Sequence, residues 1–183
     1  IRSYRKRAVP RDVLEKVLSV ASSAPTGSNR QPVKWLVIEE KKNVQSICLH
    51  VIDWMKYMLA GNPQAAAAFK AQSLVDSWEN KVDRICRDAP HLIFAYAPKE
   101  TGSGKADCDT AIAYLELALP SFGLGSCWAG YVTYAVNQWP PLADFIGISD
   151  NFQIHGAVMA GYPRFSYKRI PVRNKADVVF FNE

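Results

Sequence analysis

The chain has 183 residues, of which 49% are hydrophobic and 21% charged, with a formal net charge of +5. This composition excludes a disordered or fibrous chain and suits one globular domain with a substantial core. No apolar run reaches the roughly 18 residues of a membrane span, and no signal peptide is visible in the opening IRSYRKR. We therefore expect one domain over residues 1–183, cytoplasmic and without a membrane partner. From the abrupt start without Met we expect either a domain of a longer protein or a processed chain.

The first predicted elements lie between residues 10 and 60. Pro10 suits the first turn of a helix, and the apolar residues of PRDVLEKVLSVASSA (10–24) recur at helical spacing. KWLVIEE (34–40) predicts a strand, and residues 42–60 predict a second helix. Between the first helix and this strand lies APTGSNRQP (24–32), which holds more hydrogen-bonding side chains than a plain connection needs.

The middle of the chain predicts a helix over residues 64–87 and a buried strand, HLIFAYAP (91–98). TGSGKAD (101–107) predicts a loop, followed by a mostly apolar helix over residues 108–123 that Gly123 helps to terminate. The GSGK letters are those of a phosphate-binding P-loop. However, Lys99 stands at the required first glycine and Ala106 at the required hydroxyl residue, so ATP or GTP hydrolysis is not supported.

The last third predicts an extended segment, GSCWAGYVT (125–133), and a short helix over residues 139–147. A strand follows over residues 152–163, and ADVVFF (176–181) predicts a final short strand. Strands separated by long helices indicate an α/β or α+β domain. The terminal strand lies beyond the compact body, and such strands often pair with a sheet edge of another chain.

The cysteines and histidines give weak functional signals. Cysteines 48, 86, 108 and 127 form no CxxC pair, so we expect reduced core thiols and no metal site. Two of the three histidines, His91 and His155, fall inside apolar strand patterns, which favours packed side chains over catalytic ones. No GxSxG motif accompanies them.

Basic residues gather at the two ends of the chain. Residues 2–7 contribute three arginines and a lysine, and further cations follow between residues 164 and 175. Such clusters favour an anionic partner, either nucleic acid or a phosphorylated ligand, and a solvated basic surface is the plain alternative. The charge pattern alone leaves these readings open.

Three kinds of segment together indicate a more specific ligand. RSYR (2–5) and YKRIP (167–171) supply cations suited to phosphate oxygens. APTGSNRQP supplies neutral donors and acceptors for a polyol or a heteroaromatic group. SCWAGY (126–131) has small residues that allow backbone amides to approach a flat ligand. Phosphate, polyol and planar ring together describe flavin mononucleotide (FMN).

These segments carry a resemblance to a known family. In order, RSYR, VPRDVLEKVLSVASSAPTGSNRQPVKWLVI, APHLIFAYAP, GLGSCWAGY and GYPRFSYKRIPVR resemble the FMN-dependent nitroreductase family over nearly the whole chain. The segments DRICRDAPH and SFGLGSCWAGY resemble the sequences of a subgroup that is often fused to an N-terminal 4Fe–4S ferredoxin-like module. No such module is present in these 183 residues.

The resemblance implies a fold and an assembly. The expected fold is α+β, with three α-β-α layers and a mostly antiparallel central sheet flanked by helices. Residues 1–183 would form a single FMN-binding domain. Two copies would form a homodimer with one FMN at each side of the interface, and ADVVFF would be the strand exchanged between them.

The resemblance also implies roles for particular residues, and no metal ligand. Arg2, Ser3 and Arg5 would contact the phosphate, ribityl chain and pyrimidine edge of FMN, and Lys168 and Arg169 would complete the phosphate site. The ring and ribityl side would be lined by Pro25, Thr26, Gly27, Ser28, Asn29 and Gln31. The segment Cys127, Trp128, Ala129 and Gly130 would lie at the ring, with backbone N–H groups of the last two near flavin N5 and O4.

Two positions depart from the family pattern. Ile1 stands where the family often has another arginine, and Ala129 stands where several bacterial members have Glu. The family also often takes a polar contact from the partner subunit's helix before APH. The nearest candidates for it here are Arg84 and Arg87.

The leading functional prediction is an oxidoreductase that works by alternating half-reactions. NAD(P)H or a ferredoxin would reduce the flavin, and a nitroaromatic, quinone or similar electron-poor acceptor would reoxidise it. One alternative is a flavin-binding sensor or storage protein without broad turnover. A nucleic-acid-binding protein ranks last, because the chain lacks a basic helix and a recognisable aromatic stacking platform.

Overall fold

The structure is a computed structural model that describes residues 1–181. Its centre is a four-stranded sheet with the order β1-β2-β4-β3, in which every neighbouring pair is antiparallel. The strands are β1 (Lys34–Ile38), β2 (His91–Pro98), β3 (Gly125–Trp128) and β4 (Phe152–Gly161). The predicted α+β class and antiparallel sheet are therefore confirmed.

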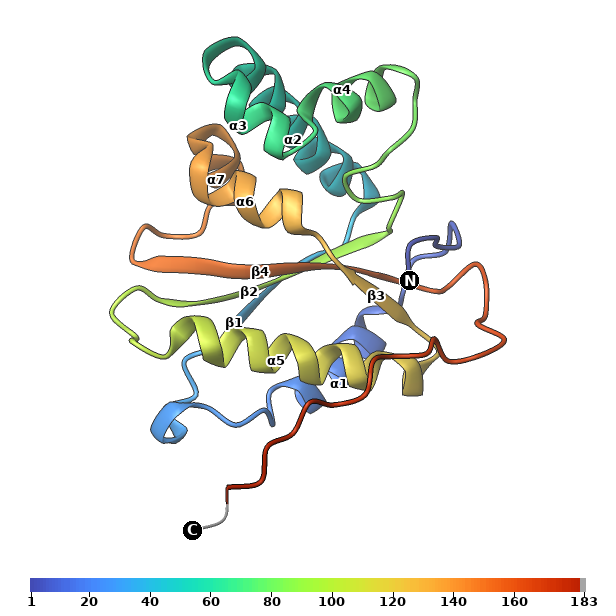
Figure 1. The fold of residues 1–183 in the computed structure, drawn as a ribbon, viewed down its shortest axis with the longest axis vertical. Helices are drawn as coiled ribbons and strands as arrows, with labels where there is room; N and C mark the ends of the chain where they lie inside the picture. The colour runs from blue at the N-terminus through green and yellow to red at the C-terminus, as the bar shows by residue number, and fades with distance from the viewer. Residues whose placement is uncertain (182–183) are drawn as a thin grey trace.

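Helices cover both faces of the sheet and complete three layers (Figure 1). One face carries α1 (Arg11–Ala21), α5 (Gly104–Ala118) and the short 3-10 helix η2 (Leu119–Phe122). The other face carries α2 (Lys41–Gly61), α3 (Pro63–Ala68), α4 (Ala71–Glu79), α6 (Gly130–Gln138) and α7 (Pro140–Ile146). A second 3-10 helix, η1 (Gly27–Asn29), lies in the loop between α1 and β1.

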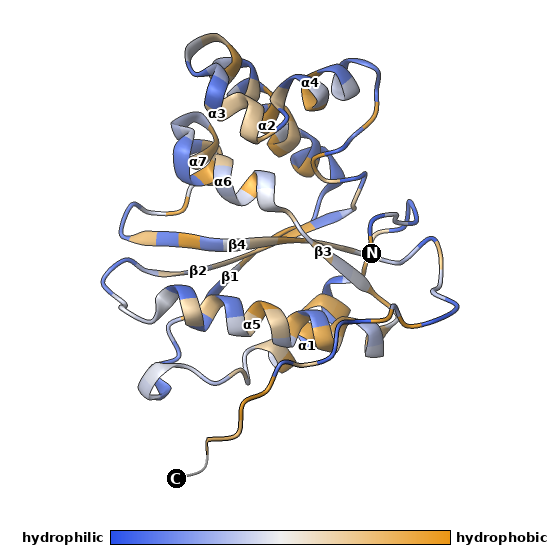
Figure 2. Ribbon diagram, in the orientation of Figure 1, coloured by the Kyte–Doolittle hydropathy of each residue, from blue (hydrophilic) through white to orange (hydrophobic). Residues whose placement is uncertain are grey.

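The core consists of two apolar clusters separated by the sheet. Successive side chains of a strand point to opposite faces. In β2, Leu92 and Phe94 accordingly join the cluster under α2 and α6, while Ile93 and Ala95 join the cluster under α1 and α5. Figure 2 shows the same pattern, since the hydrophobic stretches of α1 and α5 face the sheet. β2 is thus buried on both sides and fixes the other strands around it.

Several predicted elements are confirmed with small changes in their ends. α1 buries Leu14, Val17 and Ala21 at helical spacing, and Pro10 is its N-cap residue. The strands at β1, β2 and β4 and the helices at α2 and α7 occur where the sequence predicts them. The prediction that Gly123 terminates a helix is also confirmed, because Gly123 follows η2 with a φ of +69°.

The single helix predicted over residues 64–87 is wrong. It divides into α3 and α4, because Lys70 between them adopts a left-handed conformation with a φ of 55°. Helical structure ends at Glu79, and the next residues form turns. Alanine-rich sequence favoured one long helix. The side chains of Asn62 and Asp83 instead bind backbone N–H groups of α3 and of the turn after α4.

Two further boundaries differ from the prediction. α5 begins at Gly104, so the predicted loop 101–107 ends earlier than expected. The predicted extended segment 125–133 is a strand only as far as Trp128, because α6 begins at Gly130. The change from strand to helix within one short segment places a helix N-terminus beside the end of β3.

The C-terminal segment beyond β4 runs along the surface. Its one ladder contact is the isolated bridge between Tyr4 and Pro163, and residues 164–181 contain no strand. The strand predicted at 176–181 is therefore absent from the single chain, where Val179, Phe180 and Phe181 are exposed. Pairing of this segment with a second copy stays a prediction. In the described part of the chain, no helix is both long and apolar enough to cross a membrane.

Candidate functional site

The N-terminal RSYR segment is fixed beside the end of β4. The Arg5 N–H donates to the Tyr162 carbonyl at 2.9 Å, and the Arg164 N–H donates to the Ser3 carbonyl at 3.0 Å. Tyr4 is buried between them, and its hydroxyl donates to the Ile1 carbonyl at 2.9 Å. Burial raises the pKa of Tyr4, which keeps its hydroxyl neutral. The chain thus holds its basic N-terminal residues at one edge of the sheet.

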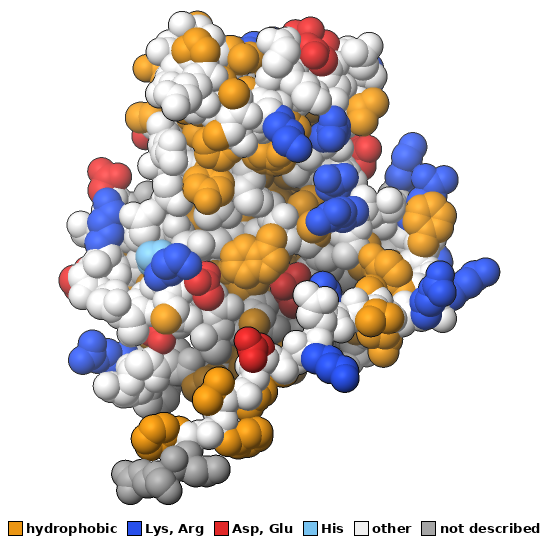
Figure 3. Space-filling view, in the orientation of Figure 1, with side chains coloured by type: hydrophobic (Ala, Val, Ile, Leu, Met, Phe, Trp, Pro, Cys, Tyr) orange, Lys and Arg blue, Asp and Glu red, His pale blue; other side chains and the backbone are white. Residues whose placement is uncertain are grey.

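A cleft of about 490 Å³ lies between this segment, β3, α6 and the α3–α4 region. Its volume falls in the range of about 300–1,000 Å³ typical of small-molecule sites. Figure 3 shows Lys and Arg side chains gathered beside apolar surface on this face of the molecule. The residues around the cleft are Arg2, Ala68, Phe69, Arg84, Ile85, Arg87, Cys127, Trp128, Gly130, Tyr131, Tyr134 and Met159.

The cleft is positively charged. Arg2, Arg84 and Arg87 line it, and no Asp or Glu does. The Arg84 Nη1 donates to the Ser73 hydroxyl at 3.1 Å and lies 3.5 Å from the Ser77 hydroxyl, so neutral groups of α4 hold this guanidinium. Within residues 1–181, none of the three arginines forms an ion pair. The cleft therefore suits an anionic ligand.

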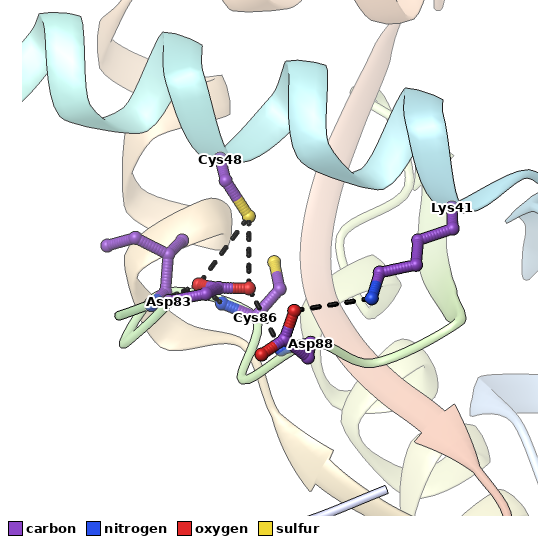
Figure 4. Close-up of polar contacts among 6 residues, drawn as sticks. Lys41, Cys48, Asp83, Cys86 and Asp88 are labelled. Atoms are coloured by element: carbon purple, nitrogen blue, oxygen red, sulfur yellow. Dashed lines mark hydrogen bonds and ion pairs between the residues drawn. The ribbon is translucent and has the colours of Figure 1, made fainter. Parts of the chain in front are cut away.

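The turn that carries Arg84 and Arg87 is built around Asp83. Its carboxylate accepts the N–H groups of Ile85, Cys86 and Asp88, each at 2.9 Å. Figure 4 shows this carboxylate pointing toward the Cys48 thiol of α2, which lies 3.8 Å from both oxygens. Sequence reasoning missed Asp83, although an Asp side chain that accepts the backbone N–H groups of the next few residues is a common feature of turns.

Two buried thiols pack under the same turn. The neighbouring Cys48 thiol, burial and the Asp83 carboxylate together raise the pKa of the Cys86 thiol, so it is protonated and unreactive near neutral pH. Burial also raises the pKa of Cys108 to about 12. All four cysteines are free, as predicted. Cys127 differs from the other three because it is half-buried and faces the cleft.

The junction of β3 and α6 places backbone donors at the cleft. The Gly130 N–H is in the first turn of α6, where no intrahelical acceptor exists, and no other backbone acceptor within residues 1–181 takes it. The partial positive charge of a helix N-terminus adds to the arginines. The Ala129 N–H differs from expectation, because it donates to the Ala157 carbonyl at 2.8 Å and is used by the sheet.

Trp128 separates this cleft from a second hollow on the same side. Its indole Nε1 donates to the Glu116 carboxylate at 2.9 Å, which fixes the ring against α5. The second hollow, of about 740 Å³, shares Trp128, Gly130 and Tyr134 with the first and also contains His155. The side chain of Trp128 is 42% exposed, so a planar ligand or a second protein surface can reach it.

The APTGSNRQP loop is anchored on α5. The Gly27 N–H donates to the Asp107 carboxylate at 2.8 Å, and the Ser103 hydroxyl donates to the same carboxylate at 2.7 Å. Ser28, Asn29 and Gln31 have positive φ angles of 53°, 53° and 52°. Non-glycine residues adopt this conformation at a cost, and such strain is common at functional sites. Sequence reasoning missed the Asp107 anchor, which lies in the predicted TGSGKAD loop.

The loop and the cleft lie on opposite faces of the sheet. The loop is beside α1 and α5, whereas the cleft is on the side of α2 and α6 (Figure 1). Of the residues proposed for FMN, the cleft unites Arg2, Cys127, Trp128 and Gly130. Residues 25–31 do not reach it within one chain, and the exposed Lys168 and Arg169 do not line it.

The packed role predicted for His91 and His155 is confirmed for only one of them. His91 is buried, its Nε2 accepts the Val9 N–H at 2.8 Å, and burial lowers its pKa, so the packed role predicted for it is confirmed. His155 is half-buried and lines the second hollow. The described residues contain no group of three or more His, Cys, Asp or Glu side chains placed to hold a metal ion.

Comparison with known proteins gives the same family as the sequence motifs. The model of the nitroreductase family matches residues 1–162. A protein of Archaeoglobus fulgidus, provisionally named NADH dehydrogenase/NAD(P)H nitroreductase, is 26% identical over 90% of this chain and 80% of its own length. An iodotyrosine deiodinase of Thermotoga neapolitana is 23% identical over 89% of this chain and 83% of its own length.

The fold agrees with that of a solved nitroreductase. The crystal structure of a nitroreductase with bound FMN from Bacteroides fragilis superposes with a TM-score of 0.80. The superposition covers 100% of this chain and 93% of the other, at 18% sequence identity. At this identity the likeness establishes the fold, and the expected three-layer architecture is confirmed.

Proposed function

The chain belongs to the nitroreductase family, and we propose on that basis that it is an FMN-dependent oxidoreductase. In our proposal a donor reduces the flavin and leaves, and a nitroaromatic, quinone or similar electron-poor acceptor takes its place. The observation that carries the proposal is the cleft itself. It joins three arginines without carboxylates, a free helix N-terminal amide and several aromatic rings.

These groups fit FMN in charge and shape. Arg2, with Ser3 and Arg5 beside it, would hold the phosphate and the ribityl chain by charge-assisted hydrogen bonds. The Gly130 N–H would donate to the polar edge of the ring, and Trp128 would pack near its plane. Lys168 and Arg169 would join the phosphate site once the exposed C-terminal segment is ordered against a partner.

A second copy of the chain would complete the site. The Pro25–Gln31 loop is rigidly anchored yet lies across the sheet from the cleft of its own chain. We therefore propose a homodimer in which this loop reaches the cleft of the other copy and residues 176–181 pair with its sheet. Exposed Leu117 and Trp128, 78% and 42% accessible, give an apolar surface for this contact.

When bound, FMN supplies reversible transfer of electrons between donor and acceptor. The contribution of the chain is electrostatic: the arginines and the Gly130 amide favour negative charge on the ring in its reduced form. NAD(P)H is the proposed donor. A ferredoxin, separate or joined to a longer form of this chain, is the second donor to be tested.

An anaerobic reduction experiment tests the proposal. We expect purified protein to show the absorption bands of bound flavin, which NADH, NADPH or reduced ferredoxin should bleach. Addition of a nitroaromatic or a quinone should restore the bands faster than it does for free FMN. Bound flavin without accelerated reoxidation would instead assign a sensor or storage role. Colourless protein that binds nucleic acid with steep salt dependence would refute the flavin proposal.

A further inference from the structure

We propose that the acceptor taken by this cleft is an anionic nitroaromatic or quinone, such as a nitroarene carboxylate, recognised by Arg84 and by the aromatic pair Phe69 and Tyr134. The inference rests on the proposed function, because it names the class of acceptor for the same cleft. It differs from the proposed function in the property that it predicts, which is a preference for negative charge on the acceptor.

Arg84 is held in place by uncharged groups. Its guanidinium is oriented by the hydroxyls of Ser73 and Ser77, and no carboxylate pairs with it within residues 1–181. Hydroxyls fix the geometry of the group but leave its charge uncompensated. A planar guanidinium that is fixed in advance loses little side-chain entropy when it binds a carboxylate through two parallel hydrogen bonds.

Arg84 reaches the cleft from a different part of the chain than Arg2, the residue proposed for the phosphate. Arg2 belongs to the N-terminal segment that pairs with the chain after β4, whereas Arg84 contacts α4. The two cations therefore enter the cleft from different elements. Arg2 with Ser3 and Arg5 is suited to the phosphate of the cofactor, which leaves Arg84 for a second anionic group.

Aromatic rings line the same cleft as Arg84. Phe69 follows α3 directly, and its ring meets Tyr134 of α6 edge to face, with 5.2 Å between the centroids. Phe69 also packs edge to face on the buried Trp54 at 5.1 Å, which fixes its ring from behind. Tyr134 is 54% exposed and so offers a ring to a ligand. An aromatic body beside a guanidinium matches an aromatic anion.

The turn that carries Arg84 is held by several hydrogen bonds. Asp83 holds the N–H groups of Ile85, Cys86 and Asp88, so the backbone on the C-terminal side of Arg84 is fixed. Arg87 has a positive φ of 56° in the same turn. The strain of this conformation and the number of bonds that hold it indicate a turn built to present its two arginines.

Equilibrium binding of two matched nitroaromatics tests the inference. 4-Nitrobenzoate and 4-nitrobenzamide share the ring and the nitro group and differ in charge. We expect the oxidised, flavin-loaded protein to bind the benzoate about tenfold more tightly, and Arg84→Gln to abolish that difference. Arg84→Lys should restore part of it, because the charge returns without the paired geometry. Lys99→Gln removes the same charge at an exposed site outside the cleft and should keep the full preference.

The outcomes separate this inference from the proposed function. Equal affinity of the wild-type protein for the two ligands would overturn the inference and leave a flavin enzyme. Loss of FMN from Arg84→Gln, with the preference for benzoate retained, would also overturn it and assign Arg84 to the cofactor. A colourless protein that still prefers the benzoate would keep the anion site and remove the redox function. Flavin absorbance of each sample is recorded before the titration.

Discussion

The Asp107 carboxylate in α5 accepts the Gly27 N–H of the APTGSNRQP loop at 2.8 Å, while its other oxygen accepts the Ser103 hydroxyl at 2.7 Å. Asp107 is only 4% exposed, so both bonds form in a site shielded from water. The space between loop and helix is equally tight, because a Cβ added at Gly27 would lie 2.8 Å from the Ser103 hydroxyl oxygen. The loop is therefore seated on α5 by one residue that α5 itself supplies.

We expect Asp107→Ala to release this loop. Loss of a buried charged acceptor leaves the Gly27 N–H and the Ser103 hydroxyl unsatisfied, and should lower the free energy of unfolding by about 2–3 kcal/mol. It should also increase cleavage of the loop by proteases and weaken retention of FMN. Asp109→Ala, on the same helix but paired with Lys105 at the surface, is the matched control. A stable Asp107→Ala protein with a protease-resistant loop would contradict the expected anchoring.

Replacement of Ser28 and Asn29 separates the role of their side chains from the strain of their backbone. Ala at both positions should weaken FMN retention more than it lowers stability, if these side chains face the flavin of the partner. Both residues have φ near 53°, where Gly is more favourable than Ala by about 1 kcal/mol. Gly at both positions should therefore match or exceed the stability of the Ala variant and lose FMN to the same extent. Unchanged FMN affinity in both variants would mean that the loop is structural.

The sequence predicted more of the fold than of the site. The strands and α1 were predictable because their apolar residues repeat with periods that the core imposes, as at Leu14, Val17 and Ala21. The break at Lys70 was not, because it depends on a left-handed residue between two helices of good propensity. The turn after α4 was missed because the predicted helix extended over Asp83, although its three N–H partners lie only two, three and five residues further along the chain.

The residues of the site also divide into those that the sequence predicts and those that it does not. Arg2, Cys127, Trp128 and Gly130 belong to motifs quoted from the sequence, and the cleft unites them. Phe69 and Tyr134 carry no local signal, because their rings meet only when the residue that follows α3 lies against α6 in the folded chain. The separation of the APTGSNRQP loop from the cleft is likewise a property of topology, since the sheet lies between them.

Asp83→Ala tests the turn that presents Arg84 and Arg87. Three backbone N–H groups and the Cys48 thiol would lose their acceptor, and we expect a loss of about 2–4 kcal/mol in the free energy of unfolding. Urea denaturation gives this quantity. Asp88→Asn removes the surface ion pair with Lys41, keeps a residue type that tolerates the φ of 57° at this position, and should have a small effect. Similar midpoints for the two variants would show that the turn does not depend on the Asp83 carboxylate.

The buried His91 should make the free energy of unfolding depend on pH. Burial lowers its pKa in the folded chain, whereas the unfolded chain has the ordinary value of about 6.5. Between these two values the unfolded chain binds more protons, so stability is fully present above about pH 6.5 and falls as pH decreases toward the folded pKa. Protonation of Nε2 removes the lone pair that accepts the Val9 N–H, so this hydrogen bond is lost.

We expect the urea concentration at the unfolding midpoint of the wild-type protein to decrease when the pH is lowered from about 7.5 to about 5.5. The decrease should be smaller in His91→Gln. The Gln carbonyl oxygen can accept the Val9 N–H but does not titrate, so the variant removes the proton linkage while keeping an acceptor. His155→Gln is the comparison, because burial also lowers the pKa of His155 although its ring is only half-buried. It should reduce the pH dependence less than His91→Gln does. Equal pH dependence in the wild-type protein and His91→Gln would show that His91 does not control acid stability.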